Sequence, residues 1–203
     1  PEYKTYHFAG HDEHVLCFGA EYSRQILIIP PLFDEMNRCR RMLVQAMRGL
    51  AERNVGSLLI DLPGCNESLA ALEQQSLTTW REAVSAAASQ LGATHIASLR
   101  GGVLIDGGAI DLPHWRLAPA KGSSLLKTMI RTRIAGDKEA GKATSEVELM
   151  GAAKTASIEL AGNLLGPAMV AELASAEPAE VAKLTLRTLG QDIAGSTLWL
   201  RPE

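Results

Sequence analysis

The chain has 203 residues, of which 46% are hydrophobic and 21% are charged, as is typical of a globular domain with a substantial core. The formal net charge of −3 excludes a global basic field of the kind that binds nucleic acid. No run approaches the roughly 18 apolar residues of a membrane span, and the sequence begins with no recognisable signal peptide, so we expect a cytoplasmic protein.

In chain order, the first part of the sequence alternates predicted strands and helices. Segments 3–9 and 14–20 are expected to form an edge hairpin. The apolar run 25–31 is stopped by two prolines, which predicts a central strand buried on both faces. A helix over 36–53 follows, with apolar residues at helical spacing, and then a second buried strand over 55–64.

The same alternation continues to residue 120. We expect a helix over 76–92 and a third buried strand over 94–100. A helix over 101–110, ended by a Gly-Gly pair, and a strand over 113–120 come next. This succession is typical of βαβ units and predicts an α/β fold with a mainly parallel sheet flanked by helices.

The pattern changes after residue 121. Segment 121–180 contains a helical run, a charged linker, a short strand or hairpin, and a small helix that begins near Pro167. We expect this segment to be a lid-like insertion within a single domain over 1–203, and the run 197–202 to be a last strand.

Three polar loops follow the buried strands at the edge where parallel sheets bind ligands. They are "PPLFDEMN" (30–37), "DLPGCNES" (61–68) and "SLRGG" (98–102). Together they resemble the α/β-hydrolase fold, and more closely the second type of exosortase A system-associated hydrolase. The runs "WRLAPAKGSSLLKTMIRTRIA" and "IELAGNLLGPAMVAEL" are also similar to that family, so the resemblance spans most of 25–175. It implies a place in a Gram-negative exopolysaccharide gene cluster.

The third loop corresponds to the nucleophile elbow, G-x-S-x-G, of this fold. Ser98, Arg100 and Gly102 occupy its Gly, Ser and Gly positions. A guanidinium is not deprotonated at working pH, so Arg100 cannot attack a carbonyl. A shift in register would make Ser98 the nucleophile, but it would then lie inside the strand.

The remaining triad residues are also missing. The acid and the histidine follow the serine in chain order in this fold. No histidine follows His114, which we expect at the start of a strand, far from the strand carboxyl ends. The sequence stops at Glu203, so this is either a member with a shortened C-terminus or part of a longer protein.

The three cysteines, Cys17, Cys39 and Cys65, are odd in number and widely spaced, which argues against a disulfide framework or a zinc site. We expect no metal and no other cofactor. Cys65 lies in the second loop and is the candidate nucleophile of an alternative, non-serine hydrolase. No histidine is expected near enough to lower its pKa, so a small half-buried thiol is the favoured interpretation.

Arg100 and Gly101 favour an anion-binding pocket. Arg100 is predicted at a helix N-terminus, and its planar fork matches a carboxylate or phosphate. Gly101 would let an anion approach the backbone. The alternative is an internal salt bridge between Arg100 and Asp34, Glu35 or Glu67 at the neighbouring strand ends.

The first loop supplies an oxyanion-hole amide in the hydrolase fold, and Leu32 or Phe33 would be the donor here. Glu35 and Glu67 are expected to complete the pocket. The sequence therefore predicts a hydrolase-fold protein that binds an anionic or acyl small molecule, or a pathway partner. The alternatives are a Cys- or water-based ester or acyl hydrolase, and a structural or interaction protein that forms a homodimer through an exposed sheet edge.

Overall fold

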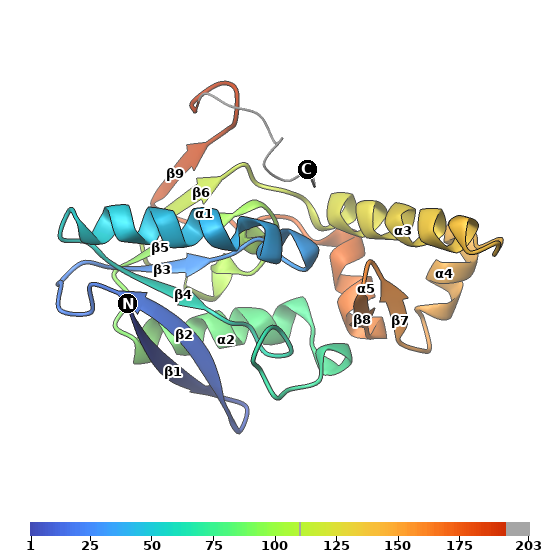
Figure 1. Ribbon diagram of the computed structural model, residues 1–203, viewed down its shortest axis with the longest axis horizontal. Helices are drawn as coiled ribbons and strands as arrows, with labels where there is room; N and C mark the ends of the chain where they lie inside the picture. The colour runs from blue at the N-terminus through green and yellow to red at the C-terminus, as the bar shows by residue number, and fades with distance from the viewer. Residues whose placement is uncertain (110, 194–203) are drawn as a thin grey trace.

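A seven-stranded sheet in the order β1-β2-β4-β3-β5-β6-β9 forms the centre of the computed structural model, which describes residues 1–109 and 111–193 (Figure 1). The strands are β1 (Glu2–Phe8), β2 (His11–Phe18), β3 (Gln25–Ile29), β4 (Gly56–Ile60), β5 (His95–Leu99), β6 (His114–Leu117) and β9 (Leu184–Arg187). β2 is antiparallel to both β1 and β4, whereas β4, β3, β5, β6 and β9 run parallel. The predicted α/β class and the central position of β3 are confirmed.

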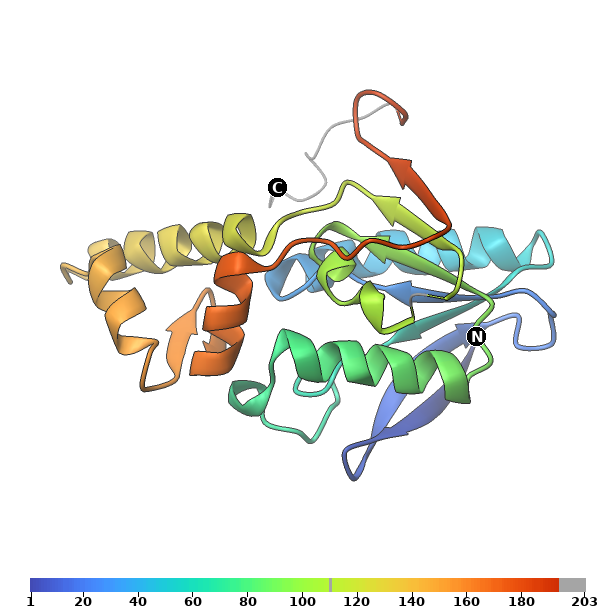
Figure 2. The same ribbon diagram turned by 180° about the vertical axis from the view of Figure 1, so that it is seen from behind.

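Two long helices, α1 and α2, cover opposite faces of this sheet (Figures 1 and 2). The helices are α1 (Asp34–Ala51), α2 (Leu77–Gln90), α3 (Gly122–Glu139), α4 (Glu146–Ala152) and α5 (Pro167–Ser175), with 3-10 turns η1 (Leu72–Gln74), η2 (Arg100–Leu104) and η3 (Asp106–Ala109). α1 presents Met36, Leu43 and Met47 at helical spacing to one face. α2 is preceded by the N-cap residue Ser76, whose hydroxyl accepts a hydrogen bond from the N–H of Thr79.

The buried strands divide their side chains between the two layers. Ile28 and Leu59 belong to the apolar cluster under α1, while Leu27 and Leu58 belong to the larger cluster under α2. Because successive strand residues point to opposite faces, continuous apolar runs are what a sheet covered on both sides requires. The core therefore holds the strand ends, and the loops that follow them, at one edge of the sheet.

Two predicted elements differ from the structure. The predicted helix over 101–110 is replaced by η2 and η3, because glycines are poor helix formers and allow close backbone contact. A Cβ on Gly102 would meet the carbonyl oxygen of Pro30, and one on Gly108 that of Arg81. The predicted charged linker contains α4, which begins with a capping box.

The last part of the sheet was not predicted. β9 was missed, because all four of its residues are exposed and the segment lacks the apolar signal of a buried strand. The strand predicted over 197–202 lies outside the described residues.

Residues 122–175 form a cap beyond the carboxyl end of β3 (Figure 1). Besides α3, α4 and α5, the cap contains a hairpin of β7 (Ile158–Leu160) and β8 (Asn163–Leu165). The carboxylate of Glu172 in α5 accepts hydrogen bonds from the N–H (2.8 Å) and hydroxyl (3.1 Å) of Thr78 at the start of α2. This attaches the cap to the helical layer. No helix within the described ranges is long and apolar enough to cross a membrane.

Candidate functional site

Arg100 directly follows β5 at a sharp turn. Its φ of +51° lies in the left-handed region, which residues other than glycine rarely adopt. A strained strand-to-helix turn of this kind is what presents the nucleophile in hydrolases with an elbow. Such backbone strain gathers at functional sites and persists only where the surroundings enforce it. The frame of a nucleophile elbow is therefore present, with an arginine at its apex.

The guanidinium of Arg100 pairs with Glu35 in the first turn of α1. Its Nε and Nη2 donate to Oε2 (3.3 Å) and Oε1 (3.2 Å) of Glu35, and its Nη1 donates to the carbonyl oxygen of Ala118 (3.4 Å). These distances exceed the roughly 2.7–2.9 Å of strong charge-assisted hydrogen bonds. The side chains of Arg100 and Glu35 are 23% and 22% exposed. The internal salt bridge weighed as an alternative is present, and it leaves the guanidinium accessible.

A pocket of about 110 Å³ lies over this pair, and we call it the elbow pocket. It joins the loop after β3 to the cap, with Leu32, Phe33 and Glu35 on one side. α3 contributes three hydroxyl residues at a spacing of four, and these are Ser124, Thr128 and Thr132. The hydroxyls of Thr128 and Thr132 donate to helix carbonyls one turn earlier. Most other lining side chains are apolar, so a ligand here would meet one charged end and an apolar wall.

Leu32 and Phe33 line the elbow pocket with buried side chains. Phe33 has a φ of +58°, so this loop is strained as well, and its ring packs 5.5 Å from that of Trp80. Within the described chain, the N–H groups of Leu32 and Phe33 donate to no acceptor. Free amides beside a guanidinium are suited to the oxygens of a carboxylate or an acyl group.

Three predicted site residues lie differently. Gly101 is buried beneath the pocket, where a Cβ would meet the side chains of Leu125 and Leu32, so its role is close packing. Glu67 is exposed on its loop and does not line the elbow pocket. Cys65 does not line it either.

Cys65 is half-buried in the loop after β4. Burial raises the pKa of this thiol to about 12, and the carboxylates of Asp61 and Glu13 act in the same direction. A nucleophilic cysteine needs a lowered pKa, because the thiolate is the reactive form. The surroundings of Cys65 therefore favour the protonated thiol at neutral pH.

Ser98 takes part in a buried network that the sequence analysis did not find. Its hydroxyl donates to Asp106 Oδ2 (2.6 Å), and that carboxylate also accepts two hydrogen bonds of 2.7 Å from Arg116. Ser98 and Asp106 are fully buried, and Arg116 nearly so. Ser98 is therefore bound inside the sheet. Asp106 and Arg116 stand at the two ends of "DGGAIDLPHWR", and ten positions apart, with a turn between them, they match no helix or strand period, so the sequence does not predict their pairing.

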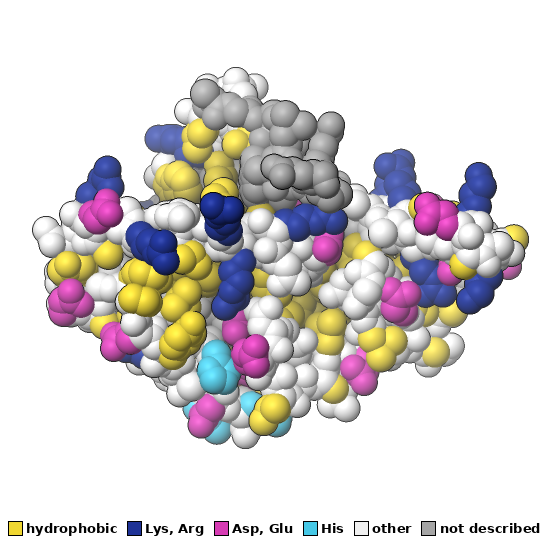
Figure 3. Space-filling model, in the orientation of Figure 1, with side chains coloured by type: hydrophobic (Ala, Val, Ile, Leu, Met, Phe, Trp, Pro, Cys, Tyr) yellow, Lys and Arg dark blue, Asp and Glu magenta, His cyan; other side chains and the backbone are white. Residues whose placement is uncertain are grey.

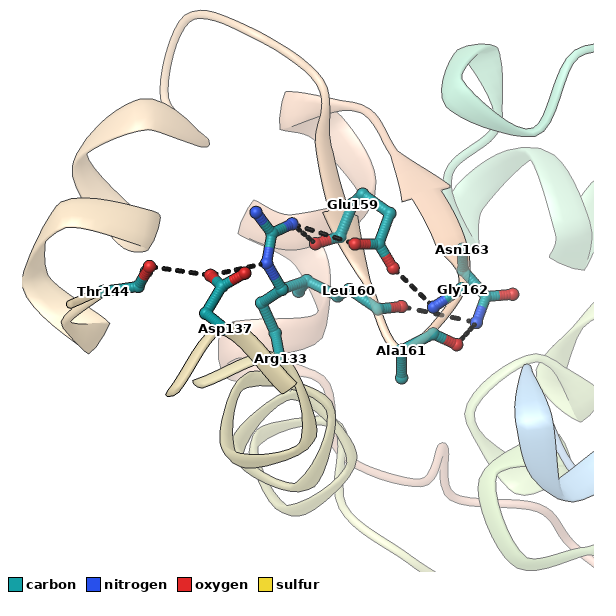
Figure 4. Close-up of polar contacts among 8 residues, drawn as sticks. All are labelled: Arg133, Asp137, Thr144, Glu159, Leu160, Ala161, Gly162 and Asn163. Atoms are coloured by element: carbon teal, nitrogen blue, oxygen red, sulfur yellow. Dashed lines mark hydrogen bonds and ion pairs between the residues drawn. The ribbon is translucent and has the colours of Figure 1, made fainter. Parts of the chain in front are cut away.

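A second missed cluster holds the cap together (Figure 4). Arg133 of α3 donates from Nε to Asp137 (2.8 Å) and from Nη1 to the carbonyl oxygen (2.7 Å) and carboxylate (2.9 Å) of Glu159 in β7. The hydroxyl of Thr144 also donates to Asp137 (2.7 Å). Hydrogen bonds from Thr144 and Arg133 lower the pKa of Asp137. We call these four residues the cap clamp; the only sequence signal for it was Arg-x-x-x-Asp on α3.

The cap clamp sets the β7–β8 turn over the elbow pocket. Ala161 and Gly162 form a two-residue turn with φ values of +49° and +79°. Glu159 also accepts a hydrogen bond from the N–H of Gly162, and Asn163 donates to the carbonyl oxygen of Ala161 (2.9 Å). Because Ala161 lines the elbow pocket, the clamp links cap structure to pocket shape (Figure 4).

The surface carries both acidic and basic side chains. On the face shown in Figure 3, acidic and basic side chains are interspersed. Among the residues in 1–109 and 111–193, no group of three His, Cys, Asp or Glu side chains could hold a metal ion. The chemistry available at the elbow pocket is therefore that of the Arg100 guanidinium, the carboxylates of Glu35 and Asp34, hydroxyls and backbone amides; Asp34 is paired with Arg38.

Comparison with known proteins identifies the fold. No protein family and no curated protein sequence matches the chain. Solved structures do match. Mouse alpha/beta hydrolase domain-containing protein 10 aligns over 93% of this chain and 77% of its own, with a TM-score of 0.61 and 12% identity. Est1E from Butyrivibrio proteoclasticus, solved with ferulic acid, aligns over 91% and 88%, with a TM-score of 0.55 and 14% identity.

A candidate hydrolase from Agrobacterium vitis S4 aligns over 93% of this chain and 77% of its own, with a TM-score of 0.54 and 14% identity. Similarity at this level of identity concerns the fold alone. The chain has the α/β-hydrolase fold, as its sequence predicts.

Proposed function

We propose that this protein binds a small anionic or acyl molecule in the elbow pocket, with Arg100 as the residue that contacts the anion. The observation that carries the proposal is an arginine at φ +51° on the apex of a nucleophile elbow, lining a pocket. In this proposal the protein is not a serine hydrolase, because no serine occupies the apex and Ser98 is bonded to Asp106 inside the sheet.

Glu35 is the internal competitor of the ligand. Its carboxylate occupies the same fork of Arg100 that a ligand carboxylate would use. The long hydrogen bonds and partial exposure of this pair make the exchange of one carboxylate for another inexpensive. The free amides of Leu32 and Phe33 then serve the second oxygen of the ligand.

The proposed setting comes from the resemblance of residues 25–175 to the exosortase A system-associated hydrolases. We place the protein in the cytoplasm, acting on an intermediate or a partner of exopolysaccharide synthesis. The mixed surface charge and the absence of an apolar helix of membrane length within the described ranges are compatible with this setting.

Calorimetric titration of the purified protein with butyrate and with acetyl phosphate tests the binding proposal. We expect Arg100→Gln to weaken binding at least about tenfold, since a charge-assisted contact is lost. Glu35→Gln should strengthen binding several-fold, because the competing charge is removed while the shape is kept. Arg48→Gln on α1, an exposed arginine that forms no ion pair with the residues described, is the matched control and should leave affinity unchanged.

Equal affinity in wild type and Arg100→Gln would overturn the proposal, and so would the absence of any saturable binding. The same preparations decide the hydrolase alternative. Steady turnover of p-nitrophenyl acetate that disappears in Cys65→Ala would establish a cysteine hydrolase in place of a binding protein. We expect no such turnover, given the raised pKa of Cys65.

As part of the same proposal, two copies pair through β9. Within the described residues β9 pairs only with β6, which leaves its other edge open. Leu184 and Leu186 are 44% and 45% exposed there. An open strand edge with exposed leucines is suited to pairing with a second copy.

A further inference from the structure

A second pocket, of about 430 Å³, is lined in part by the loop that follows β4. It is formed by the β1–β2 hairpin, the segment 63–75 and the start of α2, and it shares no lining residue with the elbow pocket. We call it the hairpin pocket. Nothing in the chemistry of the elbow uses it.

Glu13 lines the hairpin pocket from an unusual position. It stands in the inward-facing row of β2, where the next members are Val15 and Cys17, and it is only 1% exposed. Its Oε1 accepts a hydrogen bond from the hydroxyl of Ser68 (2.9 Å). Its Oε2 is buried and accepts no hydrogen bond from any residue that the structure describes.

A buried carboxylate oxygen without a partner is costly, since most such groups in native proteins are satisfied. No Lys or Arg within the described ranges forms an ion pair with Glu13. The cost of this arrangement has a functional explanation if a ligand supplies the missing donor.

The electrostatic surroundings favour a cationic donor. Asp61, just after β4, is also buried, and the buried phenol of Tyr6 in β1 donates to its carbonyl oxygen (2.9 Å). Burial raises the pKa of Tyr6, and Glu13 and Asp61 raise it further, so both carboxylates act on the same small volume. Asp61 is already paired with Arg40 and accepts a hydrogen bond from Asn66, so Glu13 is the carboxylate left to receive a positive charge that enters the pocket.

The rim of the pocket indicates the rest of the ligand. Leu69 lines it and is 88% exposed, and Phe8 and Pro63 are also part of the wall. The pocket is lined as well by the polar side chains of His11, Gln74 and Gln75. The described residues offer no group of three side chains able to hold a metal ion. A negative group at the base, with Leu69, Phe8 and Pro63 as apolar parts of the wall, fits an organic ammonium ion with a short hydrocarbon body.

We propose that the hairpin pocket is a binding site for a primary alkylammonium compound, whose ammonium group donates to Glu13 and whose hydrocarbon part covers Leu69. Ser68 holds the receiving carboxylate in place, because its hydroxyl also accepts hydrogen bonds from the N–H groups of Gly64 (2.9 Å) and Ala70 (3.2 Å). The site is independent of Arg100.

Calorimetric titration with n-butylammonium chloride, with 1-butanol as the neutral analogue, tests this site. We expect saturable binding of the ammonium ion and none of the alcohol. Glu13→Gln keeps the shape of the side chain and should weaken binding at least about tenfold, as the charge-assisted contact is lost. Glu52→Gln removes an exposed carboxylate just after α1 and should leave the affinity unchanged.

Chain length and pocket volume provide further readouts that do not depend on Glu13→Gln folding. From propyl- to hexylammonium, affinity should rise about threefold to fourfold per methylene, and this increment should shrink in Leu69→Ala. Ala71→Leu, which fills the pocket, should abolish binding. Arg100→Gln should bind the ammonium ion like wild type. Binding that persists equally in Glu13→Gln or Ala71→Leu would overturn the proposal, as would the absence of saturable binding in wild type.

Discussion

Two arginine–carboxylate pairs lie near β5, one between Arg116 in β6 and Asp106 in η3, the other between Arg100 just after β5 and Glu35, and their burial separates their roles. The Arg116–Asp106 pair is 4% and 0% exposed, has two hydrogen bonds of 2.7 Å, and also binds Ser98. The Arg100–Glu35 pair is about a fifth exposed and has longer bonds. The first pair is enclosed and structural, whereas the second remains open to exchange with a ligand.

The buried pair should therefore dominate stability. Removing one partner strands a buried charge, so Arg116→Ala should lower the free energy of unfolding by about 3–5 kcal/mol in urea denaturation. Lys121→Ala, which breaks the exposed Lys121–Glu177 pair, is the comparison and should cost less than about 1 kcal/mol. A double replacement, Arg116→Met with Asp106→Leu, should recover most of the loss. A loss below that of Lys121→Ala in the first variant would contradict this assignment.

At the residue scale, the sequence predicts neighbouring site residues best where the carboxyl ends of parallel strands lie side by side. A salt bridge from Arg100 to Asp34, Glu35 or Glu67 was one of two alternatives drawn from their places after neighbouring strands, and the structure selects Glu35. The position of Glu67 did not follow, because it depends on the path of an irregular loop. The buried Ser98–Asp106–Arg116 network was also out of reach, since the folding of η2 and η3 decides which side chains meet.

At the scale of elements, the cap depends on hydrogen bonds more than on periodicity. α4 has seven residues, too few for an apolar period to be recognised, although Ser145 and Glu148 form a capping box that signals its start. The glycine-rich stretch after β5 was mistaken for a helix because Val103, Leu104 and Ile105 are apolar and buried. Their burial comes from two tight turns instead.

The cap clamp gives the cap a defined pH dependence. Because Thr144 and Arg133 lower the pKa of Asp137, its carboxylate stays charged and bonded at pH values where an ordinary aspartate is already protonated. As the pH falls through the lowered pKa, Asp137 gains a proton and this contribution to cap stability is lost. Thr144→Val removes the largest cause, so the pKa of Asp137 should rise toward its ordinary value.

Carbon-13 NMR of the Asp137 carboxyl group, titrated from neutral to acid pH, measures this shift directly. Thr132→Val is the matched control on α3, because its hydroxyl donates to Thr128 and not to Asp137. We expect the control to leave the Asp137 titration unchanged. If Thr144→Val behaved like the control, the clamp would not have the charge distribution described.

For the whole molecule, the parallel centre of the sheet follows from the sequence, whereas the strand order does not. Apolar runs bounded by prolines and glycines mark β3, β4 and β5, and the helices α1 and α2 between them predict parallel strands, as the structure shows. β9 escapes this pattern, because its pairing with β6 is determined by the return of the chain from the cap. The sheet consequently has a well-specified centre and two edges, β1 and β9, of different origin.

This asymmetry makes a homodimer testable by hydrogen exchange at increasing protein concentration. Amides of β3, paired on both sides, should exchange slowest at every concentration because they open only with global unfolding. Amides of β9 should become more protected as concentration rises, since its free edge would pair with a second copy. β1 is the internal control: it is equally an edge, with Tyr3 76% exposed, yet no pairing is proposed there. Protection of β9 that is independent of concentration would mean that this edge stays unpaired between copies, and the homodimer would be rejected without affecting either pocket.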